Sequence, residues 1–292
     1  MKVGILASKK TEWHVLKLLD SLKARSAEAF IVPPTRLTSR IGGIPRVDSR
    51  GYAIEDFDAL LVRKVPGGTP EQVFYRMDVL HRLEEMGVYV MNTPDGIERS
   101  VDKYYTSGLL DGAGIKTPRT IVTERFEEAM DAYRDLGGDV VVKPIFGSLG
   151  AGMTRVVDED VAYRVFRALE AIGSVFYVQE YIPHRNEDVR AFVVGGRVVA
   201  SMLRKAGKWK TNIAGGGKAT PYKPSELFVN LALKAAKTVG LDYTGVDILT
   251  SETDGEAYVI EVNSTPGWEG LQTVTDMSIA DVVVDHLLSK VS

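Results

Sequence analysis

One segment of the sequence has the apolar pattern of a buried strand but contains two polar side chains, which would need a binding partner if they were buried. Residues 259–263 read VIEVN, and the apolar, β-branched residues predict a strand. Glu261 and Asn263 are two residues apart, so their side chains point to the same face of that strand. Because burying a carboxylate costs free energy unless a partner compensates it, this face is expected to meet a cation.

A second acid lies in the preceding apolar segment, TGVDIL, at Asp247. If the two strands pair antiparallel, Asp247 lies across from Glu261 and Asn263. Two carboxylates and an amide oxygen form a hard-oxygen ligand set that suits Mg²⁺. The simpler alternative is a strand end with hydrated polar side chains, since most acids are surface residues. The three residues together favour the metal site.

Composition narrows the class of protein. The chain has 292 residues, no cysteine and a net charge of −3, which predicts about two domains and excludes disulfides and thiolate metal sites. No basic face is indicated, so nucleic acid is not an expected partner. The apolar run before Ser8 is too short for a signal peptide, and no run reaches the length of a membrane span. We therefore expect a cytoplasmic protein without a membrane partner.

The order of predicted elements divides the chain into three parts. Strands and helices alternate over residues 1–97, which predicts an open α/β layer. Residues 98–182 contain two strands joined by a glycine-rich loop without an intervening helix, which has hairpin character. Residues 183–292 open with two strands around a tight Gly195-Gly196 turn. The stretch 205–223 is predicted to be a loop.

The glycine-rich loop lies in VVVKPIFGSLGAGM, where Lys143 ends a strand. Gly147, Gly150 and Gly152 would let backbone N–H groups approach an anion closely. A strand follows instead of a helix, and no Gly-Lys-Ser/Thr is present, so the loop is neither a Rossmann nor a Walker motif. The alternatives are a flexible flap over a phosphate chain and an ordinary glycine-rich hairpin.

A third segment, YVQEYIPHRNEDVRAF, ends a strand at Ile182 before Pro183. Its exposed backbone is expected to pair with a purine edge, and Asp188 is placed to accept hydrogen bonds from ribose hydroxyls. Arg190 and Arg204 lie on the strands that follow, where a hydrated surface is the competing interpretation.

These segments, taken in order, resemble the ATP-grasp ligases of the RimK-type amino-acid ligase branch. The resemblance covers about residues 98–275 and is carried by SVDKYYTSGLLDGAGIKTP, VVVKPIFGSLGAGM, VQEYI, DVRAFVVGGRVVASMLRK, WKTN, GVDIL and IEVNSTPGWEG. It implies an ATP-grasp fold of mixed α/β and α+β class behind an N-terminal open α/β (pre-ATP-grasp) domain.

The resemblance also implies roles for individual residues. Arg190, Arg204 and Lys218 would be catalytic, and Asp247, Glu261 and Asn263 would hold two Mg²⁺ ions, with Mn²⁺ as an alternative. The residues implied to bind ATP are Lys103, Lys143, Gly147, Ser148, Gly150, Gly152, Gln179, Glu180, Tyr181, Ile182, Asp188, Lys210 and Asn212.

Two departures from the family pattern concern the substrate. The TN of WKTN is followed by IAGGGK where RimK-like ligases have an Arg-Gly-Gly type of run, so Lys218 is expected to supply the missing charge. The phosphate loop has Leu149 and Ala151 where relatives often have charged residues. Neither departure affects the superfamily or the metal site.

The expected reaction is ATP-dependent ligation of a carboxylate to an amine through an acylphosphate. The branch resemblance favours L-glutamate as the amine and a small-molecule coenzyme of the tetrahydromethanopterin or deazaflavin type as the carboxylate. Arg63 and Lys64, at the end of the strand ALLVRK, are candidate contacts for a glutamate carboxylate, with hydrated surface charges as the alternative.

Other functions stay open from the sequence alone. The protein could modify a protein C-terminal tail or an amino-group carrier protein, and from another class it could be an ATP-binding regulator without turnover. The histidines His14, His81, His184 and His286 are scattered and are interpreted as structural or surface residues. Relatives are often oligomers, so a homo-oligomer is a further possibility.

Overall fold

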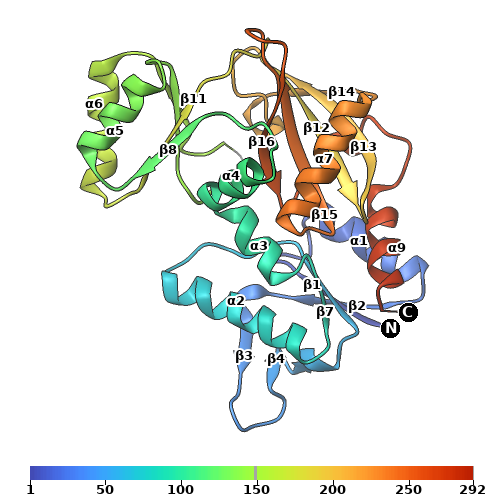
Figure 1. Cartoon of the computed structure of the whole chain (residues 1–292). Coiled ribbons are helices and arrows are strands. Elements are labelled where there is room, and N and C mark those ends of the chain that lie inside the picture. The colour runs from blue at the N-terminus through green and yellow to red at the C-terminus, as the bar shows by residue number, and fades with distance from the viewer. Residues whose placement is uncertain (148–149, 292) are drawn as a thin grey trace.

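The computed structural model describes residues 1–147 and 150–291. An N-terminal α/β layer, a central four-stranded sheet and a C-terminal five-stranded sheet follow one another along the chain (Figure 1). No helix within the described ranges is long and apolar enough to cross a membrane.

The N-terminal layer is a parallel sheet in the order β2-β1-β6-β7. Its strands are β1 (Lys2–Leu6), β2 (Glu28–Val32), β6 (Ala59–Val62) and β7 (Tyr89–Met91), and its helices are α1 (Trp13–Ala24) and α2 (Pro70–Glu85). A small antiparallel sheet of β3 (Leu37–Ser39), β4 (Val47–Ser49) and β5 (Tyr52–Ala53) lies beside it. The sequence did not predict this sheet, because strands of two or three residues are too short to show a periodicity.

Helices α3 (Pro94–Val101) and α4 (Lys103–Gly112) lead into the central unit. Its antiparallel sheet has the order β10-β9-β11-β8, formed by β8 (Thr120–Thr123), β9 (Val140–Lys143), β10 (Thr154–Val156) and β11 (Phe176–Glu180). Strands β9 and β10 pair antiparallel across the glycine-rich loop, as the sequence predicted. Helices α5 (Phe126–Asp135) and α6 (Glu159–Ala171) close a separate core around Phe166 and Phe176.

The C-terminal sheet has the order β14-β13-β12-β15-β16. Gly195 and Gly196, at φ of 56° and 72°, form the tight turn between β12 (Glu187–Val194) and β13 (Arg197–Lys205). The sheet is completed by β14 (Lys218–Pro221), β15 (Tyr243–Thr250) and β16 (Ala257–Asn263). Helix α7 (Glu226–Val239) covers one face, and α8 (Glu269–Gln272) and α9 (Ile279–Ser289) end the chain.

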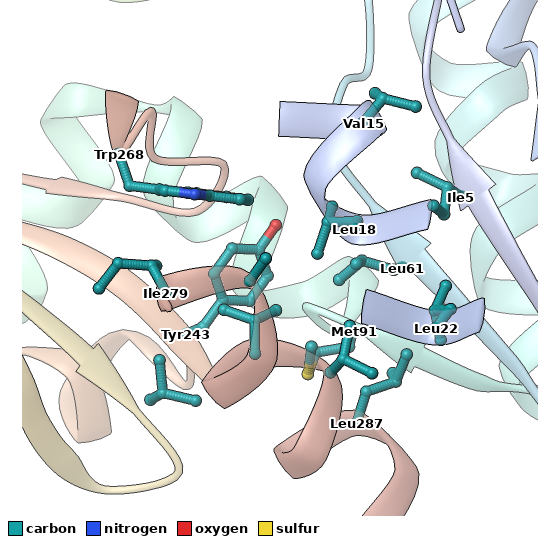
Figure 2. Close-up of a cluster of buried hydrophobic side chains, with 14 of the residues drawn as sticks. Ile5, Val15, Leu18, Leu22, Leu61, Met91, Tyr243, Trp268, Ile279 and Leu287 are labelled. Atoms are coloured by element: carbon teal, nitrogen blue, oxygen red, sulfur yellow. The ribbon is translucent and has the colours of Figure 1, made fainter. Parts of the chain in front are cut away.

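A single apolar core joins the N-terminal layer to the C-terminal sheet. Figure 2 shows Leu18 and Leu22 of α1 and Leu61 of β6 in the same cluster as Tyr243, Trp268 and Leu287. The polar rim of this contact is also paired, since Arg25 at the end of α1 forms ion pairs with Asp281 and Asp285 of α9. The loops at the carboxyl ends of β1 and β6 are therefore held in a fixed place relative to the C-terminal sheet.

We predict that the shared core makes these two units unfold together. Leu18 is fully buried, whereas Leu16 on the same helix is 43% exposed. Leu18→Ala should lower the free energy of unfolding by about 2–5 kcal/mol in one cooperative transition, and Leu16→Ala should change it by less than about 0.5 kcal/mol. Urea unfolding followed by circular dichroism measures both; an extra early transition confined to Leu18→Ala would show that the N-terminal layer unfolds by itself.

Candidate active site

A pocket opens between the central sheet and the C-terminal sheet. Strands β9 and β11 line one side, and β12, β13, β15 and β16 line the other. Twelve residues predicted from the sequence meet in this pocket: Lys143, Gly150, Gln179, Glu180, Tyr181, Ile182, Asp188, Arg204, Lys210, Asn212, Asp247 and Glu261.

The two acidic strands pair as the sequence predicted. Strands β15 and β16 are antiparallel, Asp247 lies opposite Glu261, and Gly245 lies opposite Asn263. The amide nitrogen of Asn263 donates a hydrogen bond to the Gly245 carbonyl at 3.3 Å. This bond turns the amide oxygen of Asn263 away from Gly245, where it can act as a ligand.

Asp247 is the centre of a buried ion-pair network. Arg190 binds both of its carboxylate oxygens at 2.6 Å, and Arg204 approaches at 2.8 Å. Arg204 also binds Asp188 through two hydrogen bonds of 2.7 and 2.6 Å, and Asp188 accepts a further one from Thr211 at 2.6 Å. Burial raises the pKa of Asp247, but the two arginines outweigh burial and hold this pKa below its ordinary value.

Glu261 differs from Asp247 in having no such partner. It is half-buried, and within residues 1–147 and 150–291 no hydrogen bond or ion pair to its carboxylate is present. Lys143 and Lys103 are close enough for the Glu261 charge to act on the pKa of each. This half-buried carboxylate can therefore accept a further cation.

The burial and the hydrogen bond of Lys143 suit it to bind an anion. Burial lowers its pKa to about 8, with a smaller contribution from Lys103, while Glu261 opposes the shift. Its Nζ donates to Gln179 Oε1 at 2.6 Å. The Gln179 amide nitrogen in turn donates to the hydroxyls of Thr120 and Tyr177, which keeps the amide oxygen turned toward the lysine. Gln179 thus positions Lys143.

Lys103 lies at the start of α4 and reaches the glycine-rich loop. Its Nζ donates to the carbonyls of Gly147 at 2.9 Å and Ile145 at 3.3 Å. Gly147, Gly150 and Gly152 all have positive φ, a conformation that glycine adopts without strain. The predicted Ser148 lies outside the described residues.

The strand end after β11 offers backbone groups to the pocket. The Glu180 carboxylate is held by the backbone N–H and the side chain of Arg119 at 2.8 and 2.7 Å. The guanidinium of Arg155 lies 3.5 Å from the centre of the Tyr181 ring. In the part of the chain that the structure describes, the Ile182 N–H has no acceptor, so it is available to a ligand.

His184 contributes to the site in a way that the sequence analysis missed. It is 7% exposed, and its ring nitrogens face the carbonyls of Ile182 at 2.6 Å and Trp209 at 3.0 Å. It therefore links the strand end after β11 to the loop that carries Lys210 and Asn212. Only its position directly after the Ile182-Pro183 strand end could have indicated this role.

Lys218 is not brought to the pocket. It belongs to strand β14, inside the stretch predicted to be a loop, and it pairs with Lys205. Arg204 and Lys205 are neighbours on β13, so their side chains point to opposite faces. Lys218 accordingly lies on the face away from Arg204 and Asp247. The loop prediction was wrong here, because three glycines precede a strand of only four residues and no strand pattern is visible in the sequence.

The donor set fits the hard divalent ion that the sequence predicted. The carboxylates of Asp247 and Glu261 and the amide oxygen of Asn263 come from two neighbouring strands, and all three offer oxygen. Glu261 has no hydrogen-bond or ion-pair partner among the described residues, and it lies beside two lysines that suit phosphate oxygens. The residues present can therefore hold a metal–nucleotide complex.

Comparisons with known proteins identify the family. Residues 1–97 match the RimK PreATP-grasp domain, and residues 100–287 match the RimK-like ATP-grasp domain. The chain belongs to the RimK-like ATP-grasp family. It is an ADP-forming carbon–nitrogen ligase that uses ATP and a divalent metal ion.

Relatives extend over the whole chain. It is 35% identical over 295 residues to the tetrahydromethanopterin:alpha-L-glutamate ligase of Methanococcus maripaludis, covering 99% of this chain and 98% of the relative. A probable alpha-L-glutamate ligase of Pseudoalteromonas translucida is 34% identical, over 98% of this chain and 95% of the relative.

Solved structures show the same fold. A RimK domain ATP-grasp protein from Sphaerobacter thermophilus superposes with a TM-score of 0.79 at 22% identity, covering 99% of this chain and 100% of that one. The ATP-grasp ligase PsnB, in complex with minimal precursor, Mg and ADP, superposes with a TM-score of 0.76 at 23% identity, covering 99% of this chain and 98% of that one.

We predict that ATP affinity falls as pH rises from 7.5 to 9.5. Lys143, with a pKa of about 8, loses its charge across this interval, while bound phosphate favours the charged lysine. Binding should take up a proton above the pKa, and affinity should fall by up to about tenfold per pH unit. Calorimetric titration in buffers of different ionisation enthalpy measures both. Lys143→Arg keeps its charge and should bind ATP with nearly constant affinity; an equal slope in the two proteins would contradict the assignment.

Proposed function

We propose that this protein joins the amine of L-glutamate to a carboxylate of a small-molecule coenzyme, with tetrahydromethanopterin as the first candidate. The observation that carries the chemistry concerns Glu261, which lies opposite Asp247 and beside two lysines and has no partner in the part of the chain that the structure describes. The substrates are supported by relatives that are 35% identical over nearly the whole chain and are named tetrahydromethanopterin:alpha-L-glutamate ligases.

ATP would lie between the two sheets. The available Ile182 N–H and the carbonyl of Glu180 suit the edge of adenine, and Asp188, which lines the same pocket, would accept hydrogen bonds from ribose. Lys143, Lys103 and the glycine-rich loop would hold the phosphates. Lys210, whose Nζ donates to the Met153 carbonyl at 2.6 Å, and Asn212 would close the pocket from the opposite side.

Asp247, Glu261 and Asn263 would hold two Mg²⁺ ions, with Glu261 shared between them, and Mn²⁺ would suit the same oxygens. When bound, the ions neutralise the phosphate charge and orient the γ-phosphoryl group. The protein would contribute position and charge, and the described residues that line the pocket include no serine or cysteine nucleophile.

The reaction proceeds in two steps. A carboxylate oxygen of the coenzyme attacks the γ-phosphorus, the bond to the bridging oxygen breaks, and ADP leaves. The amine of glutamate then attacks the acylphosphate carbon and a tetrahedral oxyanion forms. Phosphate leaves with the bonding electrons of its C–O bond and takes the proton that the nitrogen gives up. Arg190 and Arg204 would balance the developing charge. In this structure both are paired with Asp247, and Lys218 lies on the other face.

Ligation to a protein tail or a carrier protein is the second candidate. The structural likeness to peptide-modifying ATP-grasp ligases such as PsnB is at 22–23% identity and supports the fold alone. The cytoplasmic location and the homo-oligomer expected from the sequence stay predictions.

We predict that the enzyme, given Mg²⁺, ATP, tetrahydromethanopterin and glutamate, releases ADP and forms a product heavier by one glutamyl residue. Glu261→Gln should lower turnover by about a thousandfold or more, because a shared metal ligand loses its charge while the shape is kept. Glu256→Gln, an exposed acid on the same hairpin, is the control and should behave as wild type. Coupled ADP release and mass spectrometry measure both.

Two results would contradict separate parts of this proposal. Near-normal turnover of Glu261→Gln would refute the metal assignment. Turnover with another amino acid but not with glutamate would refute only the choice of amine.

A further inference from the structure

A half-buried arginine lies where an open α/β sheet binds ligands. In the N-terminal sheet, β2 lies on one side of β1 and β6 on the other, so the strand order reverses between β1 and β6. Ligands of such sheets bind at the carboxyl ends of the strands at this reversal. Arg63 directly follows β6, and its backbone N–H donates to the carbonyl of Leu6 at the end of β1 at 3.0 Å. Arg63 thus marks the reversal point.

The guanidinium of Arg63 is held in place from the C-terminal sheet. Its Nη1 donates to the Tyr243 hydroxyl at 3.1 Å, and its central carbon lies 4.5 Å from the centre of the Trp268 ring. Figure 2 shows the side chains of Tyr243 and Trp268 within the shared core, where both are fully buried. Trp268 is fixed in turn, since its backbone N–H donates to His14 Nε2 at 3.0 Å.

Nothing in residues 1–147 and 150–291 neutralises the charge of Arg63. No carboxylate lies within ion-pair distance, in contrast to the bidentate partners of Arg190 and Arg204. The Arg63 Nε atom is buried without a hydrogen-bond acceptor, and so is the indole nitrogen of the fully buried Trp268. An uncompensated, partly desolvated cation beside two orphaned donors indicates that an anion completes this site.

The neighbouring titratable groups do not supply that anion. His14 Nε2 accepts a hydrogen bond, so its ring is neutral and can offer only an Nδ1 donor; burial and the charge of Arg63 lower its pKa to about 4. Lys9 and Lys10 follow β1, and Lys64 follows Arg63. Glu12, at the start of α1, is the one acid in these strand-end segments, and it forms no ion pair with Arg63.

This arginine is connected to the metal and phosphate residues by one short loop. Residues 264–268 run from Asn263 to Trp268. In the loop, Pro266 packs against Gly245, because a side-chain carbon at Gly245 would lie 3.1 Å from Pro266 and 3.4 Å from Arg190. Pro266 and Arg190 thus both lie beside Gly245, and the loop ends at Trp268, which contacts Arg63.

We propose that Arg63 binds the side-chain carboxylate of the incoming amino acid, which takes no part in the reaction. The proposal rests on the proposed function, in which glutamate reacts through its amine and keeps both carboxylates. Near a triphosphate these carboxylates require a cation, and a guanidinium can bind one through two parallel hydrogen bonds. Arg63 would accordingly select an acidic amino acid over a neutral one.

The test is calorimetric titration of glutamate into the enzyme saturated with Mg²⁺ and a non-hydrolysable ATP analogue. Arg63→Gln should weaken glutamate binding by at least about tenfold, Arg63→Lys should recover part of the loss, and Arg36→Gln, at an exposed arginine of the same domain, should bind as wild type. Unchanged glutamate affinity in Arg63→Gln, or no binding of glutamate to wild type, would overturn the proposal.

Trapping with hydroxylamine distinguishes a failure of glutamate binding at Arg63 from a failure of the proposed reaction. It replaces the amine but has no carboxylate, so with ATP and tetrahydromethanopterin it should trap the acylphosphate as a hydroxamate at equal rates in wild type and Arg63→Gln. Loss of hydroxamate only in Arg63→Gln would mean that Arg63 supports the loop, and would overturn its role in glutamate binding. No hydroxamate in wild type would refute the tetrahydromethanopterin reaction, while the titration still decides on Arg63.

Discussion

Two arginines share one buried aspartate, and the geometry of the pocket depends on that arrangement. Arg190 and Arg204 both bind Asp247, and Arg204 also binds Asp188. Placing four charges in a protein interior is costly unless the hydrogen bonds are nearly ideal, and here two of the pairs are bidentate. The network fixes the side chains of β12, β13 and β15 on one face, and so fixes the strand that carries Glu261.

The charges of these side chains also indicate which kind of ligand the pocket can bind. The two arginines and two aspartates of the network neutralise one another, and Glu261 is left facing Lys103 and Lys143. Such a site suits a ligand that brings both divalent cations and phosphate oxygens. The N-terminal layer has a core of its own on one face and shares a second apolar core with the C-terminal sheet, whereas the core of the central sheet is separate from both. The N-terminal layer and the C-terminal sheet are thus packed directly against each other.

The sequence predicted those parts of the site that depend on local patterns. Alternation within two consecutive strands placed Asp247 opposite Glu261, and Lys143 was recognisable at the end of an apolar strand. The pairing of Arg190 with Asp247 was not predictable, because it depends on the register of strands 57 residues apart. The prediction that Lys218 lies in a loop was wrong, because the preceding glycines gave no sign of the short edge strand β14. The contacts of His184 were not predictable, because both are to backbone carbonyls.

Anomalous difference density from crystals grown with Mn²⁺ and a non-hydrolysable ATP analogue would show whether Glu261 holds the metal ions. The metal assignment predicts two peaks between the nucleotide phosphates and β15 and β16, with Glu261 as a ligand of both ions and Asp247 and Asn263 as ligands of one each. Phosphates bound without any peak at Glu261 would contradict it. Metal found only at the exposed cluster of His81, Asp95 and Glu98 would contradict it equally.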